Sequence, residues 1–138
     1  MRKRLALFGS GRGSNGEAIY KAIEAGHIES EIVLIISDRS NVGIVEKGYT
    51  WQIPVHIIDP TMYAQKEEWV QATLDVLASY AVDGVLLAGY MRVLPPTFAQ
   101  AYRGNILNIH PSLLPAFTGL QAQKQALLKG VKYTGCTV

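Results

Sequence analysis

Two polar side chains stand at the end of an apolar run in the last third of the chain. Asn108 and His110 lie two residues apart in the segment Asn105–Pro111. Alternate side chains of a strand point to the same face, so this pair would project together, about 7 Å apart along the backbone. An amide beside an imidazole suits acyl transfer, because the amide can stabilise a tetrahedral oxyanion and the imidazole can move protons near neutral pH. The same pair can also be purely structural, and the residue types alone leave both interpretations open.

A glycine-rich loop lies near the N-terminus, just before a helical pattern. Residues 9–16 read Gly-Ser-Gly-Arg-Gly-Ser-Asn-Gly. Glycines let the backbone approach an anion closely, and a helix N-terminus offers free N–H groups and the positive end of a dipole. We therefore predict a phosphate site, in which Ser14 and Asn15 are N-cap residues whose side chains also help to hold a monophosphate. A purely structural turn is the alternative.

The same loop admits a dinucleotide interpretation. Residues 11–16 match the pattern G-x-G-x-x-G, and Asp38 follows about 22 residues beyond Gly16, after a second apolar run. However, the match begins two residues later than the position next to the strand that the dinucleotide fingerprint requires. Asp38 also sits in a turn-like Ser-Asp-Arg-Ser-Asn that many loops contain. A dinucleotide-binding domain therefore stays the less favoured alternative.

A third segment, residues 87–94, ends another apolar run. Gly89 would let a ligand approach the backbone, and Met91, Val93 and Leu94 would offer an apolar wall to a flat ring. An ordinary turn with hydrophobic filler explains the same residues equally well.

The spacing of the apolar runs predicts the elements that position these residues. Five runs, separated by about 20 to 30 residues, predict parallel strands with helical crossovers. These runs are Leu5–Phe8, Ile32–Ile36, Val55–Ile58, Val85–Leu87 and Ile106–Ile109. Helical patterns cover residues 17–25, 63–80, 97–102 and 120–129, with a short helix near 42–45. We predict one α/β domain over residues 1–138, an open, mainly parallel twisted sheet with helices on both faces, whose ligands bind beyond the carboxyl ends of the strands.

The composition excludes several classes of protein. With 138 residues, 49% hydrophobic and 17% charged, the chain can bury an ordinary core. A net charge of +2 implies no basic stripe for nucleic acid, and no apolar run approaches the roughly 20 residues that span a bilayer. The single Cys136 excludes an internal disulfide and fits a reducing cytoplasm. We expect small-molecule substrates, no metal, no nucleic-acid or membrane partner, and a monomer or homodimer.

Three motifs together resemble the phosphoribosylglycinamide formyltransferase family. They are Gly11-Arg12-Gly13-Ser14-Asn15, then Ala88-Gly89-Tyr90-Met91-Arg92-Val93-Leu94, then Asn108-Ile109-His110-Pro111-Ser112-Leu113-Leu114-Pro115 with Gly119-Leu120. The resemblance runs through the whole chain in order, and its last block is highly specific. It implies a Rossmann-like formyltransferase fold and transfer of a formyl group from 10-formyltetrahydrofolate to the amine of glycinamide ribonucleotide, a step of purine biosynthesis.

The resemblance also implies roles for individual residues. Gly13, Ser14 and Asn15 would hold the substrate phosphate. The segment Met91, Arg92, Val93 and Leu94 would line the pterin pocket, with Lys66 where the family usually has an arginine near the folate. Lysine keeps the positive charge at that position but lacks the planar guanidinium, which can donate two parallel hydrogen bonds. Asn108 would polarise the formyl oxygen beside the folate, and His110 would act as general acid.

The end of the chain departs from the family pattern. Residues Thr134–Val138 look like the start of a strand, and the family's third catalytic residue, an aspartate, would lie a few residues beyond it. We therefore expect the sequence to be the N-terminal two-thirds of the enzyme, incomplete at its C-terminus and possessing a reduced catalytic set. A non-catalytic fragment that binds the ribonucleotide phosphate is the corresponding alternative. Methionyl-tRNA formyltransferase and formyltetrahydrofolate hydrolase are related alternatives, but the Gly-Ser-Asn loop argues for the ribonucleotide substrate.

Overall fold

A computed structural model describes all 138 residues and divides the chain into two compact units, residues 1–106 and 107–138. The strands are β1 (Lys3–Phe8), β2 (Ser30–Ser37), β3 (Val55–Ile57), β4 (Gly84–Leu87) and β5 (Ile106–Asn108). The helices are α1 (Ser14–Glu24), α2 (Gly43–Thr50), α3 (Lys66–Ser79), α4 (Pro96–Ala101) and α5 (Ala122–Lys129), with a 3₁₀ turn η1 at Pro60–Met62. All five predicted strands and all five predicted helices are present.

The strands form one sheet in the order β3-β2-β1-β4-β5. Strand β1 lies between β2 and β4 and pairs with both in parallel, and β2 pairs in parallel with β3. Each parallel neighbour is reached through an intervening helix, as parallel pairing requires. The predicted open parallel α/β sheet is therefore confirmed.

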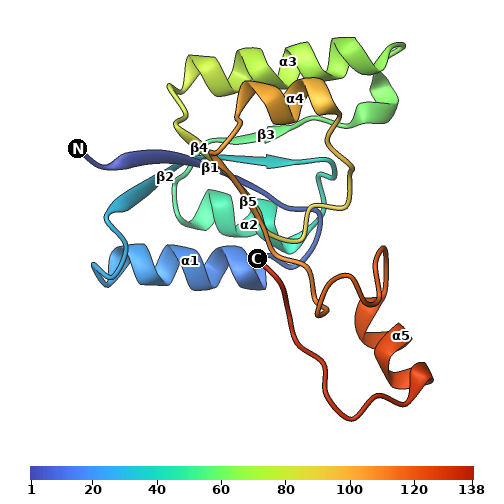
Figure 1. Ribbon diagram of the computed structural model, residues 1–138. Helices are drawn as coiled ribbons and strands as arrows, with labels where there is room; N and C mark the ends of the chain where they lie inside the picture. Colours follow the sequence, from blue (N-terminus) through green and yellow to red (C-terminus); the bar gives the residue numbers. More distant parts are fainter. The chain divides into compact units, whose positions relative to one another are not determined.

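Apolar side chains of alternating residues fill the two faces of the sheet in the first unit. Phe8 and Ile36 are fully buried in a core with residues of α3 and α4, whereas Leu7 and Ile35 are fully buried in a second core with Ile44 of α2. Figure 1 shows the corresponding layers, with α3 and α4 over one face and α1 and α2 over the other. Strands covered on both faces explain why the apolar runs are continuous rather than alternating.

Two helices follow the sequence pattern closely. On α3, which lies within the helical pattern predicted at residues 63–80, the buried side chains form one stripe of Trp69, Val70, Thr73 and Leu77. Helix α1 is followed by its C-cap Ala25 and then by Gly26, which has a φ of 76°. There the N–H of His27 donates to Ala22 at 2.9 Å and that of Gly26 donates to Ile23 at 2.9 Å, the two hydrogen bonds of a Schellman ending.

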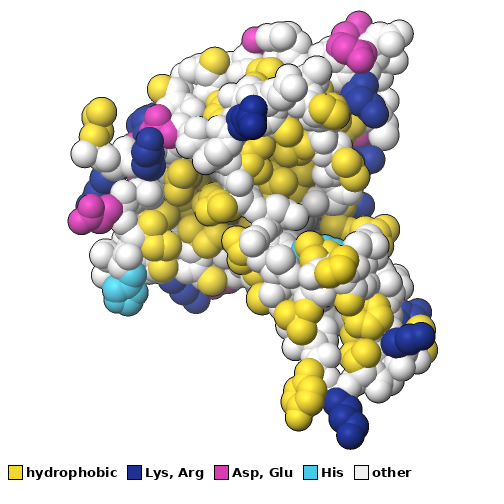
Figure 2. All heavy atoms as spheres, in the orientation of Figure 1, with side chains coloured by type: hydrophobic (Ala, Val, Ile, Leu, Met, Phe, Trp, Pro, Cys, Tyr) yellow, Lys and Arg dark blue, Asp and Glu magenta, His cyan; other side chains and the backbone are white.

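The unit of residues 107–138 contains α5 and a folded loop. The strand predicted at Thr134–Val138 is reduced to a single antiparallel bridge between Thr137 and His110, whose N–H groups each donate to the other's C=O at 2.9 Å. A bridge of one residue pair has no continuing ladder, so the flanking residues adopt no strand. Several large apolar side chains are exposed on this unit (Figure 2), among them Leu120, Leu127, Leu128 and Tyr133. None of the helices of the chain is both long and apolar enough to span a membrane.

Candidate functional site

The glycine loop leads directly into α1, and its geometry corrects one prediction. The N-cap residue is Gly13, with a φ of 75°, and no side chain caps the helix, so Ser14 and Asn15 are the first two helical residues rather than the cap. The left-handed backbone at this point favours glycine over serine or asparagine. The first intrahelical bond runs from the Glu17 N–H to the Gly13 C=O at 2.8 Å. The N–H groups of Ser14, Asn15 and Gly16 therefore have no helical acceptor and stand ready for an anion.

Helix α2 holds the loop in place from one side. The Ile44 N–H donates to the Gly11 C=O at 3.0 Å, and the Lys47 Nζ donates to the Arg12 C=O at 2.9 Å. Gly43 lies so close that a Cβ built on it would be 2.8 Å from the Arg12 carbonyl oxygen. These contacts fix the backbone of the loop before any ligand binds, which reduces the entropy lost on binding.

The first turn of α1 contains one carboxylate, and two lysines neutralise it. Glu17 lies 2.8 Å from the Lys21 Nζ and 3.5 Å from the Lys47 Nζ. The hydrogen bond from Lys21 is the main reason that the pKa of Glu17 lies below its usual value. Arg12, which is exposed, takes part in no ion pair. Glu17 therefore does not repel a phosphate at the loop, and the Arg12 guanidinium is free to bind one.

The segment after β4 is tied to the glycine loop through Ser10. The Ser10 Oγ accepts the Met91 N–H at 2.9 Å, and the Ser10 N–H donates to the Gly89 C=O at 3.0 Å. Ser10 is 2% exposed, so both bonds are shielded from water. The Tyr90 ring packs edge-on against Phe8 with a centroid distance of 5.2 Å, and burial raises the pKa of its hydroxyl above the usual range. The structure thus joins two of the three predicted motifs through one buried serine.

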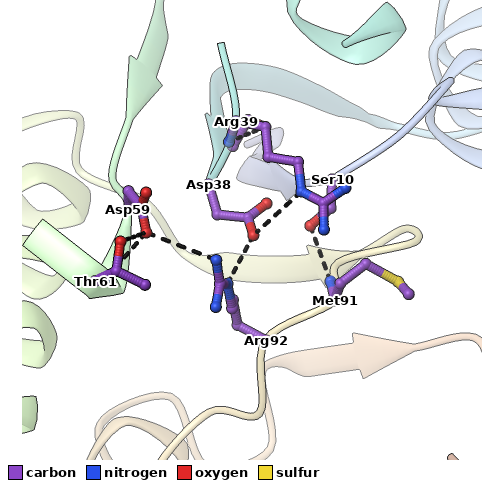
Figure 3. Close-up of polar contacts among 8 residues, drawn as sticks. Ser10, Asp38, Arg39, Asp59, Thr61, Met91 and Arg92 are labelled. Carbon is purple, nitrogen blue, oxygen red and sulfur yellow. Dashed lines mark hydrogen bonds and ion pairs between the residues drawn. The ribbon is translucent and has the colours of Figure 1, made fainter. Parts of the chain in front are cut away.

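The side chains of this segment divide into exposed apolar groups and one anchored charge. Met91 is 49% exposed and Val93 is 90% exposed. The Arg92 Nε donates to the Asp38 Oδ2 at 2.7 Å, and its Nη2 lies 3.6 Å from the Asp59 Oδ1 (Figure 3). The hydrogen bond to Asp38 raises the pKa of Arg92 above its usual value. The segment therefore offers apolar side chains outward while its guanidinium is held by carboxylates.

Asp38 does not have the geometry that a dinucleotide site needs. Its side chain is fully buried, with Oδ2 occupied by Arg92 and the Arg39 Nε at 3.9 Å. A carboxylate that binds a ribose 2′-hydroxyl must be accessible to it. The structure contains no group of three His, Cys, Asp or Glu side chains that could hold a metal ion. Asp38 and Asp59 act on Arg92 instead.

Lys66 is the first residue of α3. Its side chain is exposed and forms no ion pair or hydrogen bond to a side chain in the structure. Its ammonium group is therefore free to meet an anionic group of a ligand, as predicted for the folate. Its role stays a prediction.

In the second unit, His110 has a defined hydrogen bond and Asn108 does not. The His110 Nε2 lies 2.9 Å from the Phe117 carbonyl oxygen. A carbonyl can only accept, so Nε2 is the N–H donor and Nδ1 is the nitrogen left to exchange a proton. Asn108, the last residue of β5, is exposed, and its amide is free to donate to a ligand.

A buried network around Ser112 holds the loop that follows His110. Ser112 is fully buried and donates from Oγ to the Ala116 C=O. The Thr137 Oγ1 donates to the Ser112 C=O at 2.7 Å and accepts the Leu114 N–H at 3.0 Å. The Ser-Leu-Leu-Pro part of the third motif is thus a folded loop held by hydrogen bonds of Ser112 and Thr137.

Sequence reasoning missed three residues of these sites. Ser10 lies inside the glycine loop, but nothing in its type shows that its hydroxyl is buried against the segment after β4. Lys47 belongs to a short helix without a motif, and Asp59 precedes a turn. Such contacts join residues 33 to 81 positions apart, so local pattern does not reveal them.

The chain is similar to known proteins over nearly its whole length. A family model described as formyl transferase matches residues 3–138. Phosphoribosylglycinamide formyltransferase of Bacillus subtilis is 40% identical over 136 residues, which are 99% of this chain and 70% of that protein. The human trifunctional purine biosynthetic protein adenosine-3 is 40% identical over 135 residues, 98% of this chain but 13% of that much longer protein.

Solved structures give the same result. Phosphoribosylglycinamide formyltransferase from Bacillus halodurans aligns with a TM-score of 0.95 and 46% identity, covering 98% of this chain and 70% of that one. A formyltetrahydrofolate deformylase from Pseudomonas syringae aligns with a TM-score of 0.87 at 28% identity, covering 99% of this chain and 45% of that one. The fold is thus shared by a transferase and a deformylase, and sequence identity is higher to the transferase.

Proposed function

The chain belongs to the formyl transferase family, and we propose that it transfers a formyl group from 10-formyltetrahydrofolate to the amine of glycinamide ribonucleotide in purine biosynthesis. The observation that carries the proposal is the match to phosphoribosylglycinamide formyltransferases over 98–99% of the chain at 40–46% identity. The glycine loop and the two later motifs lie within this match.

The N-terminus of α1 would bind the phosphate of the ribonucleotide. The free N–H groups after Gly13 supply donors, and the helix dipole favours the negative charge. The hydroxyl of Ser14 and the amide of Asn15 would add side-chain donors at the same helix end. Since Glu17 is paired with Lys21, it does not oppose the phosphate.

The formyl donor would bind at the segment after β4. The exposed side chains of Met91 and Val93, with the partly buried Leu94, supply an apolar surface for the flat pterin. Lys66 would meet an anionic part of the folate. Arg92 belongs to this segment, but its guanidinium is already engaged by two carboxylates.

Asn108 and His110 would perform the chemistry. The amine of the ribonucleotide attacks the formyl carbon, and the carbonyl oxygen becomes an oxyanion that the Asn108 amide stabilises. The C–N bond to the folate then breaks as the leaving nitrogen takes a proton from the imidazolium form of His110, and the attacking nitrogen releases one proton, which restores the imidazolium. Because Nε2 of His110 is committed to Phe117, the transferred proton comes from Nδ1.

Formyl transfer measured on the purified protein tests the proposal. We expect His110→Ala to lower kcat by about 10²- to 10⁴-fold, the usual contribution of general acid–base catalysis, and Asn108→Asp to lower it by about 10²- to 10³-fold through loss of the oxyanion donor. His27→Ala is the matched control, since His27 is exposed and lies outside all three motifs. Turnover unchanged by His110→Ala would exclude the acid role.

Calorimetric titration with glycinamide ribonucleotide separates binding from catalysis. Binding without turnover would favour the alternative, a protein that binds the ribonucleotide phosphate but does not catalyse the reaction. No binding and no turnover would overturn the proposal. The substrates are small molecules, and we infer a cytoplasmic monomer or homodimer, for which the single Cys136 is consistent with a reducing compartment.

A further inference from the structure

The backbone polar groups from Arg92 to Leu94 have no hydrogen-bond partners within the protein. None of the N–H or C=O groups of these three residues takes part in a hydrogen bond within the protein. On either side of this run, the Met91 N–H donates to Ser10 and the Pro95 C=O accepts from the N–H groups of Phe98 and Ala99. A run of unpaired main-chain groups beside exposed apolar side chains is suited to binding a ligand, but only if something else holds it in shape.

The Arg92 side chain provides that hold. Its guanidinium contacts Asp38 through Nε at 2.7 Å and Asp59 through Nη2 at 3.6 Å (Figure 3). Arg92 therefore connects the residue that follows β2 with the segment that follows β3. Asp59 is itself fixed, because its Oδ1 accepts both the N–H and the hydroxyl of Thr61 at 2.9 and 2.8 Å. Two carboxylates from separate segments thus fix the direction of one side chain.

Burying the Asp38 carboxylate at this position costs folding free energy. The carboxylate is fully buried, and Oδ1 has no hydrogen-bond partner in the structure. A buried charge with an unsatisfied oxygen opposes folding, and most buried polar atoms are paired. A neutral side chain would remove this cost if Asp38 served the core alone. Its strong contact is with Arg92, which points to a role at the adjoining backbone.

We propose that Asp38 is a positioning residue of the formyl-donor site, which acts through Arg92 to hold the main chain of Arg92–Leu94 in the conformation that binds the folate. This rests on the proposed function and adds a residue to it. Asp38 does not touch the donor; the Arg92 guanidinium serves as the link rather than as a ligand contact. Asp38, which the dinucleotide pattern would place at a ribose, thus positions the backbone of Arg92–Leu94 instead.

The test measures donor and ribonucleotide separately in Asp38→Asn. Loss of a ground-state contact raises KM and leaves kcat in place. We expect KM for 10-formyltetrahydrofolate to rise about tenfold or more, a change of about 1.4 kcal/mol, with kcat and KM for the ribonucleotide changed less than about threefold. A purely structural role would instead lower the active fraction and Tm without separating the two KM values. Arg92→Met should give the same rise, and the double variant should be no worse than either single one, because both act through one link.

Glu31→Gln is the matched control. It removes an Arg–carboxylate pair of similar length but with more exposed side chains, Arg4–Glu31 at 2.8 Å, near the beginning of β1 and β2. We expect donor KM to stay at the wild-type value. If Asp38→Asn leaves donor KM unchanged while Arg92→Met raises it, Arg92 contacts the donor directly and the proposal is wrong.

A measurement without substrates keeps this inference distinct from the proposed function. Backbone order parameters of Arg92–Leu94 should fall in Asp38→Asn and in Arg92→Met, but not in Glu31→Gln. Unchanged order parameters would overturn the positioning role even if formyl transfer is confirmed. Conversely, a wild-type protein that binds neither substrate would overturn the proposed function, and with it the donor-site role, whatever the order parameters show.

Discussion

Ile44 of α2 lies against the Cα of Gly13, the N-cap residue of α1. A Cβ built on Gly13 would lie 2.7 Å from the Ile44 Cδ1 and 3.0 Å from the Ile44 Cα. The same glycine has a φ of 75°. Two independent constraints, close packing and a left-handed backbone, therefore require glycine where the glycine loop turns into the helix that would bind phosphate.

The first prediction is that Gly13→Ala destabilises the protein and weakens ribonucleotide binding. The left-handed backbone costs a residue with a Cβ about 1–2 kcal/mol, and overpacking against Ile44 costs about 1–3 kcal/mol. Urea unfolding and calorimetric titration measure the two effects. Gly26→Ala is the control, since Gly26 shares the positive φ but has open space around its Cα. It should show only the backbone cost and normal binding, and equal losses in the two variants would contradict the packing argument.

The second prediction concerns the buried link between the glycine loop and the segment after β4. Ser10→Ala leaves the Met91 N–H without its acceptor, at a cost of about 1–3 kcal/mol in the free energy of unfolding. Hydrogen exchange at the Met91 amide should also become faster. Ser79→Ala removes an exposed hydroxyl bonded to the Val76 C=O and should change stability much less. Equal stability of the two variants would show that the Ser10 bond is not a link of this kind.

The parts of the fold that follow local rules could be predicted from the sequence. Continuous apolar runs predict the parallel strands, because both faces of the sheet are covered. Gly26 marks the end of α1, because glycine adopts the left-handed backbone of the Schellman hydrogen bonds at low cost. The start of α1 could not be predicted as well. Serine and asparagine are common N-caps, and the packing of Ile44 and the left-handed backbone that favour Gly13 there are seen only in the structure.

The candidate site, like the fold, has some features that the sequence predicts and others that only the structure shows. Motif spacing pointed to Gly13, Met91 and His110, because these residues lie at or after the ends of predicted strands. The contacts that hold them come from distant parts of the chain, such as Ser10 to Met91 and Asp38 to Arg92. The spacing between Asp38 and the glycine loop fits a dinucleotide pattern, but that spacing does not reveal that the Asp38 side chain is buried.

The third prediction concerns the loop after His110. Thr137→Val removes the donor to the Ser112 C=O and the acceptor of the Leu114 N–H, so the loop of residues 110–118 should open locally. Hydrogen exchange at the Leu114 amide measures this directly, and kcat should fall if His110 loses its place. Thr134→Val is the control, because Thr134 is exposed and its hydroxyl has no partner. Unchanged protection of Leu114 would contradict the role of Thr137.

The last prediction concerns the response of Asp59 to pH. The N–H and hydroxyl of Thr61 hold the pKa of Asp59 below its usual 3.8 in the folded protein, the N–H being the larger cause. A lowered pKa means that the ionised carboxylate stabilises the fold above pH 3.8, and that this contribution is lost as pH falls through the folded-state pKa. Thr61→Val removes the hydroxyl but keeps the N–H, so the pKa should rise part of the way toward 3.8. Acid unfolding should then begin at a higher pH.

Carbon-13 NMR titration of the Asp59 carboxyl measures the shift. Thr50→Val, whose hydroxyl bonds the Glu46 C=O rather than a carboxylate, should leave the Asp59 midpoint in place. A midpoint that Thr61→Val does not move would show that the hydroxyl makes no contribution, and that Asp59 relies on the Thr61 N–H and its cationic neighbours to face Arg92 as an anion.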